Sequence, residues 1–241
     1  MHWGIFLEQV PDGDGAWWQM LGSGLLWTLA TAACAWVIAF TIGSAIGVAR
    51  TTRSGWLVRC GDAYVEVFRN VPLIVQFFLW YFVVPGLIPA LQRAVSDMDP
   101  TLFQFETAVV CLGLFTAARI AEQVRAGILS LARGQRSAAY ALGLGEAQTY
   151  RYVLLPMAYR IIIPPLTSEL MNLVKNTAVA YSIGLTELFF RTREMGAITF
   201  RYFEAFAAAT IVYGVVAMSC NRVMAWVERR TAVPGYLGGR R

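Results

Sequence analysis

Apolar residues occur along this chain in long stretches that are separated by short segments containing arginine. No Asp, Glu, Lys or Arg occurs between Asp14 and Arg50, from Val71 to Gln92, or from Ala205 to Asn221. The hydrocarbon core of a bilayer is about 30 Å thick, and roughly 20 apolar residues in an α-helix cross it. The pattern therefore predicts a membrane protein with several spans.

We predict five spans, at 22–49, 70–92, 102–120, 160–183 and 203–226. The prediction of the third span is weaker because this span contains Glu106. The prediction of the fourth is weaker because it contains Glu169 and Lys175. The expected fold class is all-α integral membrane, with a five-helix transmembrane domain at 22–228. We expect an N-terminal segment at 1–21 and a C-terminal tail at 229–241 to flank this domain.

Arginine is concentrated in three segments, at 50–69, at 119–160 and in the tail from Arg222. Short loops rich in Lys and Arg remain on the cytoplasmic side of a membrane. Five spans with the N-terminus outside and the C-terminus inside place all three segments in the cytoplasm. We predict this topology for the chain.

The composition supports a membrane location and excludes other classes. Of the residues, 57% are hydrophobic and 15% are charged, with a mean hydropathy of +0.53, whereas about a quarter of a soluble domain is charged. A soluble enzyme and a disordered protein are therefore excluded. The net charge of +5 comes from arginine in short loops between the apolar stretches. This distribution is typical of the topology of a membrane protein rather than of a nucleic-acid-binding surface.

Neither a metal site nor a catalytic thiol is expected. The single histidine is His2, and the cysteines form no C-x-x-C motif; they are Cys34, Cys60, Cys111 and Cys220. Scattered cysteines of this kind are usually packing residues.

The segment 119–160 is long for a loop between spans, and long loops are often functional. Its centre predicts a short alanine-rich helix, a glycine break and a second short helix ended by Pro156. Ala138, Ala139 and Leu142 share one helical face, where small side chains allow close approach of a partner. Gly143 and Gly145 permit a positive φ. The alternative is a helical hairpin that rests on the bilayer surface.

Three motifs in this chain resemble those of bacterial permeases. Ala138-Ala139-x-x-x-Gly143 followed by Val153-x-Leu155-Pro156 resembles the "EAA" loop of the transmembrane subunits of ABC importers. Arg69 to Gln76 is similar to the segment that opens the second span of polar amino acid permeases, and Lys175 to Ala178 resembles their K-[DN]-T-S segment. The resemblance extends from about Trp27 to Trp226 and is closest to glutamate/aspartate permeases.

This resemblance implies a type I ABC importer permease in the bacterial inner membrane that imports polar amino acids, most closely glutamate and aspartate. It implies a second permease subunit, either homologous or identical, two cytoplasmic ABC ATPases and a periplasmic solute-binding protein. It also implies that the loop contacts the ATPase, through Ser137, Ala138, Ala139, Leu142, Gly143, Glu146 and Pro156. Related loops usually carry glutamate at Ser137, and whether Glu146 or an arginine replaces it stays open.

The chain contains no nucleotide-binding motif. Its only lysine is Lys175, and Val174 precedes it, whereas a Walker A loop requires glycine before its lysine. We therefore expect no enzyme activity and no cofactor in this chain, with ATP and Mg²⁺ bound by the partner ATPase.

Polar residues in the fourth span fall within an arc of about 120° on one side of a helix; they are Ser168, Glu169, Asn172, Lys175 and Asn176. One hypothesis is that this polar stripe lines the translocation pathway, with Lys175 attracting a substrate carboxylate. The alternative is that it joins two permease subunits by hydrogen bonds between helices. Glu169 and Lys175 lie outside the i, i+4 reach, so each should have another partner.

Two other functions remain open from the sequence alone. The first alternative is a permease for another polar amino acid, of the glutamine, arginine or histidine type. The second is a stand-alone secondary transporter or channel. The latter class commonly shows internal repeats, and no repeat is evident here.

Overall fold

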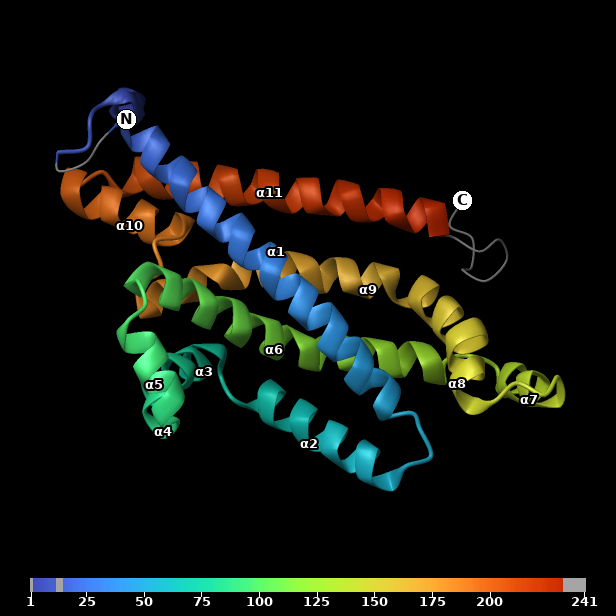
Figure 1. Cartoon of the computed structure of the whole chain (residues 1–241). Helices are drawn as coiled ribbons and strands as arrows, with labels where there is room; N and C mark the ends of the chain where they lie inside the picture. The colour runs from blue at the N-terminus through green and yellow to red at the C-terminus, as the bar shows by residue number, and fades with distance from the viewer. Residues whose placement is uncertain (1, 12–14, 232–241) are drawn as a thin grey trace. The chain divides into compact units, whose positions relative to one another are not determined.

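The computed structural model describes residues 2–11 and 15–231, and within them all regular secondary structure is helical apart from one antiparallel bridge between Gln9 and Ala16 (Figure 1). The chain divides into two compact units. Unit 1 contains residues 1–37, 71–113 and 172–218, and unit 2 contains 38–70, 114–171 and 219–241. Most of the predicted tail at 229–241, with Arg240 and Arg241, lies outside the described residues, as do Asp12 and Asp14.

Three of the described helices are long and apolar enough to cross a membrane: α1 (Trp17–Ala49), α6 (Pro100–Leu129) and α11 (Tyr202–Thr231). They coincide with the first, third and fifth predicted spans, although α6 extends well beyond residue 120. A fourth crossing exists only if α2 (Gly55–Asn70) and the helical segment Leu73–Leu87, which are bent by 104°, form one span. The predicted number of five spans is therefore not confirmed.

The second predicted span, 70–92, is wrong as a single helix. The structure divides it into α3 (Leu73–Phe78), a π-helical turn η2 (Leu79–Val83), α4 (Val84–Leu87) and α5 (Pro89–Ser96). Pro72 and Pro89 explain the two breaks, because proline cannot continue a helix and pushes the preceding residue into an extended conformation. Pro85 follows the π-helical turn, and Val84 before it stays helical. Ile88, which precedes Pro89, has φ −121° and ψ 103°.

The fourth predicted span, 160–183, is also divided. The helix α9 (Leu155–Asn176) is followed by the 3-10 helix η4 (Thr177–Ile183), which ends at Gly184 with φ +91°. Pro164 and Pro165 lie inside α9. Together with Arg160 and Glu169 they lower its hydropathy, so α9 is not among the helices that are long and apolar enough to cross a membrane.

Unit 2 is held together by close helix packing at glycines. A Cβ atom placed on Gly43 or Gly47 of α1 would lie 2.7 Å from atoms of α6, and one on Gly127 of α6 would lie 2.6 Å from Ile162 of α9. Small residues allow helix backbones to approach in this way within a membrane. A buried cluster of Val65, Ala118 and Ala121 joins α2 to the same face of α6.

Unit 1 contains an apolar core around Trp17, Leu188 and Met195 and a buried carboxylate. Glu187 caps the N-terminus of α10 (Leu188–Thr199) by accepting hydrogen bonds from the backbone N–H groups of Phe189 and Phe190, at 2.9 and 2.8 Å. It also accepts a bond of 3.0 Å from the Tyr213 hydroxyl of α11. Burial raises the pKa of Glu187, and these bonds oppose that effect.

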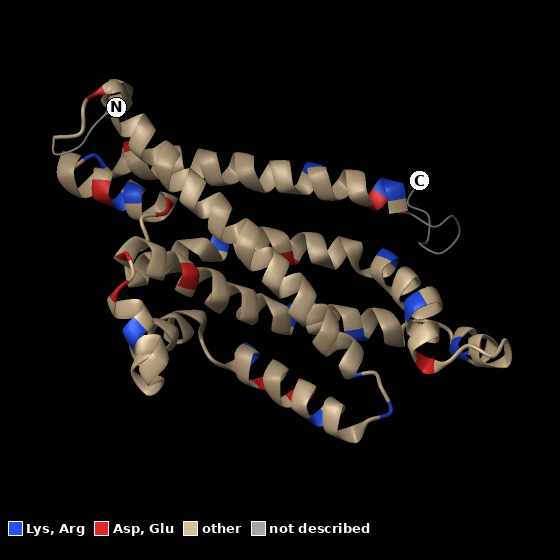
Figure 2. Ribbon diagram, in the orientation of Figure 1, with Lys and Arg blue, Asp and Glu red and all other residues tan. Residues whose placement is uncertain are grey.

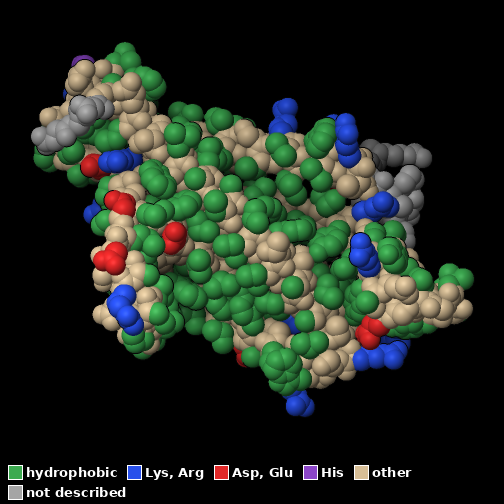
Figure 3. All heavy atoms as spheres, viewed as in Figure 1, with side chains coloured by type: hydrophobic (Ala, Val, Ile, Leu, Met, Phe, Trp, Pro, Cys, Tyr) green, Lys and Arg blue, Asp and Glu red, His purple; other side chains and the backbone are tan. Residues whose placement is uncertain are grey.

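Hydrophobic side chains also cover much of the surface seen in Figure 3. Leu26 and Val37 of α1 and Ile211 and Val215 of α11 are each at least half exposed. An apolar surface of this extent is unfavourable in water and suits helices that face lipid or another membrane subunit.

Candidate functional site

The predicted loop at 119–160 is shorter than expected, because α6 continues to Leu129. It contains α7 (Arg133–Ala141), α8 (Glu146–Thr149) and the π-helical segment η3 (Tyr150–Leu154), which leads directly into α9. We call residues 130–154 the connecting loop. Arg119 and Arg125, counted as loop residues in the topology argument, lie within α6.

The glycine break after α7 is confirmed at Gly143, which has φ +77°. The N–H of Leu144 donates to the carbonyl of Ala139 at 3.1 Å, and the N–H of Gly143 donates to that of Tyr140 at 2.9 Å. These two bonds form a Schellman motif, whose left-handed residue favours glycine. The same expectation is wrong for Gly145, which has φ −70° and precedes α8 as its N-cap.

Pro156 does not end the second helix, as its position in the sequence suggested. It is the second residue of α9, and every residue from Glu146 to Asn176 is helical. The π-helical turn at Tyr150–Leu154 lies directly before α9, and such a turn changes the hydrogen-bond register in which a proline must fit. The connecting loop therefore ends in one unbroken helical segment that carries the polar stripe.

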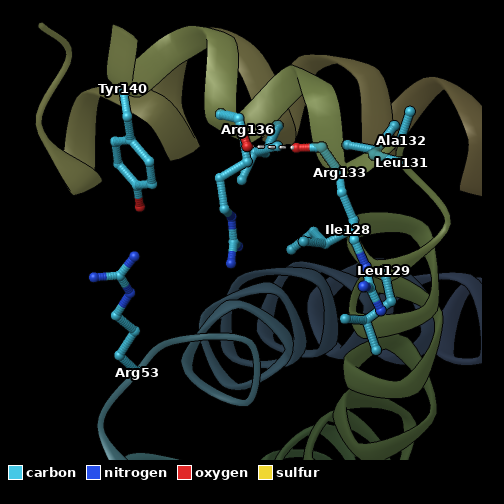
Figure 4. A pocket seen from close by; sticks show the side chains of 10 residues that line it. Arg53, Ile128, Leu129, Leu131, Ala132, Arg133, Arg136 and Tyr140 are labelled. Carbon is cyan, nitrogen blue, oxygen red and sulfur yellow. Dashed lines mark hydrogen bonds between the residues drawn. The ribbon is translucent and has the colours of Figure 1, made fainter.

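The residues of α7 that were expected to share one contact surface differ in their environments. Ala138 and Leu142 are exposed, Leu142 at 82%, whereas Ala139 is buried. Ser137 lies on the opposite side of the helix, where it lines a cavity with Arg133 and Tyr140 (Figure 4). Glu146 is exposed at the start of α8.

Tyr150 anchors the connecting loop, a role that its position in the sequence did not indicate. The ring is buried, and its hydroxyl donates to the backbone carbonyl of Thr51 at 2.7 Å. The same hydroxyl accepts a bond of 3.0 Å from Arg136, whose guanidinium lies 5.3 Å from the ring centroid. Tyr150 thus links α7 and the start of α9 to the turn after α1.

A group of ion pairs fixes the adjoining end of α1. Arg50 is buried and lies 2.7 Å from both Asp62 of α2 and Glu122 of α6, while Arg69 lies 3.8 Å from Glu122. Figure 2 shows the charged positions along α2. A buried cation is stable only with such partners, so this group joins three helices of unit 2.

The polar stripe of α9 is only partly accessible, since Glu169 is buried. Ser168 and Lys175 are exposed, Asn172 and Asn176 are half-buried, and the apolar Leu173 and Val174 are buried. This exposure is costly for a membrane helix facing lipid. The polar side therefore requires a cover of protein or water.

Glu169 pairs with a residue other than Lys175, as expected. Its Oε2 lies 3.8 Å from Nη1 of Arg119 in α6, and no ion pair of Lys175 is found within the described residues. The sequence did not identify Arg119 because the third span was predicted to end beside it. A guanidinium on α6 is thus a further charged group beside the stripe.

Residues 39–233 match the family model described as "Binding-protein-dependent transport system inner membrane component". The chain is 48% identical to the "Glutamate/aspartate import permease protein GltJ" of Escherichia coli (strain K12), over 99% of this chain and 98% of that protein. It is 32% identical to the "Glutamate/aspartate import permease protein GltK" of Escherichia coli O6:H1, over 87% and 92% of the two chains.

A solved structure is similar in fold as well. The chain in the "Crystal structure of an amino acid ABC transporter with histidines" superimposes with a TM-score of 0.74 at 28% identity, covering 89% of this chain and 95% of that one.

We predict that Tyr150→Phe loosens the connecting loop without unfolding the protein. The change removes the hydroxyl's bonds to the Thr51 carbonyl, to the Thr51 hydroxyl and to Arg136, all of them partly buried. We expect a cost of about 1–3 kcal/mol, while the ring remains for Arg136. Hydrogen exchange of the α7 amides should become about tenfold faster. Tyr152→Phe is the matched control, since Tyr152 is 63% exposed; equal exchange in the two variants would contradict the anchoring role.

Proposed function

Since the chain belongs to the family of binding-protein-dependent transport system inner membrane components, we propose that it is the permease subunit of an ATP-driven importer of glutamate and aspartate. The observation that carries this proposal is the identity of 48% with GltJ along 99% of the chain. The type I ABC importer permease fold agrees with it.

The proposed assembly contains this chain, a second permease, two cytoplasmic ABC ATPases and a periplasmic solute-binding protein. Similarity to both GltJ and GltK supports a pair of homologous permeases. The family description itself names a binding protein. Val174 before Lys175 excludes a Walker A loop at the only lysine, so ATP hydrolysis is assigned to the partner subunits. The arginine distribution supports a periplasmic N-terminus and a cytoplasmic C-terminus.

The connecting loop is proposed as the contact with the ATPase. Ala138 and Leu142 are exposed on one side of α7, and an apolar side chain with 82% exposure suits a protein groove. The Schellman bonds and Tyr150 hold α7 against the start of α9. A displacement of α7 by the ATPase would therefore move the helix from Glu146 to Asn176 as one body.

The polar stripe is proposed to line the translocation pathway. Lys175 provides a cation for a substrate carboxylate, and Ser168, Asn172 and Asn176 provide hydrogen-bonding groups. Arg119 neutralises Glu169, so this carboxylate does not repel an acidic substrate. Hydrogen bonds between two permease subunits remain the alternative role of the stripe.

Deletion of this gene in its host is expected to abolish uptake of labelled glutamate and aspartate and to leave arginine uptake unchanged. A plasmid copy should restore the lost uptake. The reverse pattern would assign the chain to a basic amino acid system, and unchanged uptake of every amino acid tested would exclude an import role.

Lys175→Ala is expected to lower glutamate uptake at least about tenfold, because a lost charge-assisted contact contributes about 1.5–3 kcal/mol. The permease complex should still assemble, as judged by copurification of the second permease. Lys175→Arg, which keeps the charge, is the control and should retain most of the uptake. Loss of the complex would favour the subunit-interface role, and normal uptake with normal assembly would exclude both roles.

Gly143→Ala is expected to weaken copurification of the ATPase, because a side chain at φ +77° is strained by about 1–2 kcal/mol. Gly134→Ala is the matched control. Both glycines have open space around a new Cβ, and only Gly143 has a positive φ. Equal ATPase recovery from the two variants would show that the turn geometry is not needed for the contact.

A further inference from the structure

The cavity beside α7 is a basic pocket in unit 2 with a volume of about 470 Å³. Three guanidinium groups line it: that of Arg53, in the turn between α1 and α2, and those of Arg133 and Arg136 in α7 (Figure 4). None of the residues that line the cavity is acidic. We call this cavity the arginine pocket.

Two of the three arginines of this pocket contact tyrosines rather than carboxylates. Arg53 lies 5.7 Å from the ring centroid of Tyr140, and Arg136 donates to the Tyr150 hydroxyl. No ion pair of Arg53, Arg133 or Arg136 is found in the part of the chain that the structure describes. Each guanidinium has five N–H donors in a planar fork that matches phosphate oxygens, so the pocket attracts a phosphate group.

The pocket also has an apolar part to its lining. It consists of the last turn of α6 and nearby residues, namely Ile128, Leu129, Leu131 and Leu154, and the side chain of Arg133 lies beside Ile128 and Leu129 (Figure 4). Leu129 is 62% exposed and is the final residue of an apolar helix long enough to cross the bilayer. The pocket therefore combines cationic groups with apolar side chains at the end of a membrane helix, where lipid headgroups lie.

We propose that the arginine pocket binds the phosphate headgroup of an anionic phospholipid, with the start of an acyl chain against Leu129. A free phosphate would satisfy the arginines but would leave the apolar part of the lining uncovered. The exposed Ala138 and Leu142 lie on the other side of α7, so a protein that contacts them leaves the pocket open. The inference is separate from the substrate and the ATPase contact proposed above.

Ser137 adds no charge to the pocket, whose positive charge comes from its three arginines. Its side chain lines the cavity, and its hydroxyl donates to the backbone carbonyl of Arg133 at 3.3 Å. Loops of the kind that this segment resembles usually carry glutamate here. A carboxylate at this position would neutralise part of the positive charge, whereas serine leaves it available for an external anion.

Ser137→Glu is therefore the most direct test, with Ser137→Gln as the uncharged control of similar size. The full chain would be purified with its copurifying subunits in detergent containing equal amounts of phosphatidylglycerol and phosphatidylcholine. Native mass spectrometry would count the retained lipids. We expect the wild type and Ser137→Gln to retain phosphatidylglycerol selectively and Ser137→Glu to retain about tenfold less. Equal retention by all three would overturn the proposal.

A second pair of variants tests the arginines without adding a carboxylate. Arg53→Gln should lower phosphatidylglycerol retention, whereas Arg59→Gln, which removes an exposed arginine of α2 outside the pocket, should not. Displacement of the lipid by an equimolar amount of inorganic phosphate would overturn the lipid assignment. If Arg53→Gln reduced the recovery of the ATPase and left lipid retention unchanged, the pocket would bind an acidic group of that partner, and the proposal would be wrong.

Discussion

The cost of polar groups within a membrane constrains this structure more than any other factor. The helix α9 carries a carboxylate, an ammonium and two amides on one side, and each of them is unfavourable in hydrocarbon. For Glu169 this cost is reduced by Arg119 of α6, whose Nη1 lies 3.8 Å from Oε2 of the carboxylate. Lys175 is exposed within the described residues. The proposed polar pathway and the proposed contact with a second permease would each give this ammonium a polar environment.

The proposed role of the connecting loop sets a second requirement. A short helix can transmit force only if its ends are fixed. The C-terminal end of α7 is fixed by the left-handed turn at Gly143, and the start of the next helical segment is fixed by the buried Tyr150. Beyond Tyr150 the chain stays helical to Asn176. The π-helical turn at Tyr150–Leu154 precedes Pro156, and the segment continues without a break. This continuity is the basis of the proposal that a contact at the loop moves the polar stripe.

Much of this architecture could be predicted from the sequence, and the failures have physical causes. Charge-free stretches identified α1 and α11 because hydropathy is a property of the local sequence. The stretch 70–92 was equally apolar, yet its prolines break it, which hydropathy does not register. The helix α2 was treated as a loop because the arginines of 50–69 were counted for topology, although Arg59 and Arg69 lie on this helix and Arg69 lies beside Glu122.

The features of the candidate site that depend on local backbone chemistry could be predicted from the sequence. The features that depend on partners far away along the chain could not. Gly143 was identified correctly, since few residues tolerate a positive φ. The polar stripe was correctly placed on one helix by its spacing. The partner of Glu169 and the anchor at Tyr150 were not identified, because Arg119 is 50 residues away along the chain and Thr51 is 99 residues away. Pairings of that kind depend on tertiary packing.

The two sides of α7 show how one short helix can serve two neighbours. Its outward side has the small and apolar Ala138 and Leu142, and its inward side has arginines that face a cavity. A glutamate at position 137 would join the inward side and neutralise it within the chain. Serine makes no such charge contact, and no ion pair of these arginines is found within the described residues. The proposed anion beside the membrane therefore rests on the same position at which a charge contact to the ATPase was in doubt.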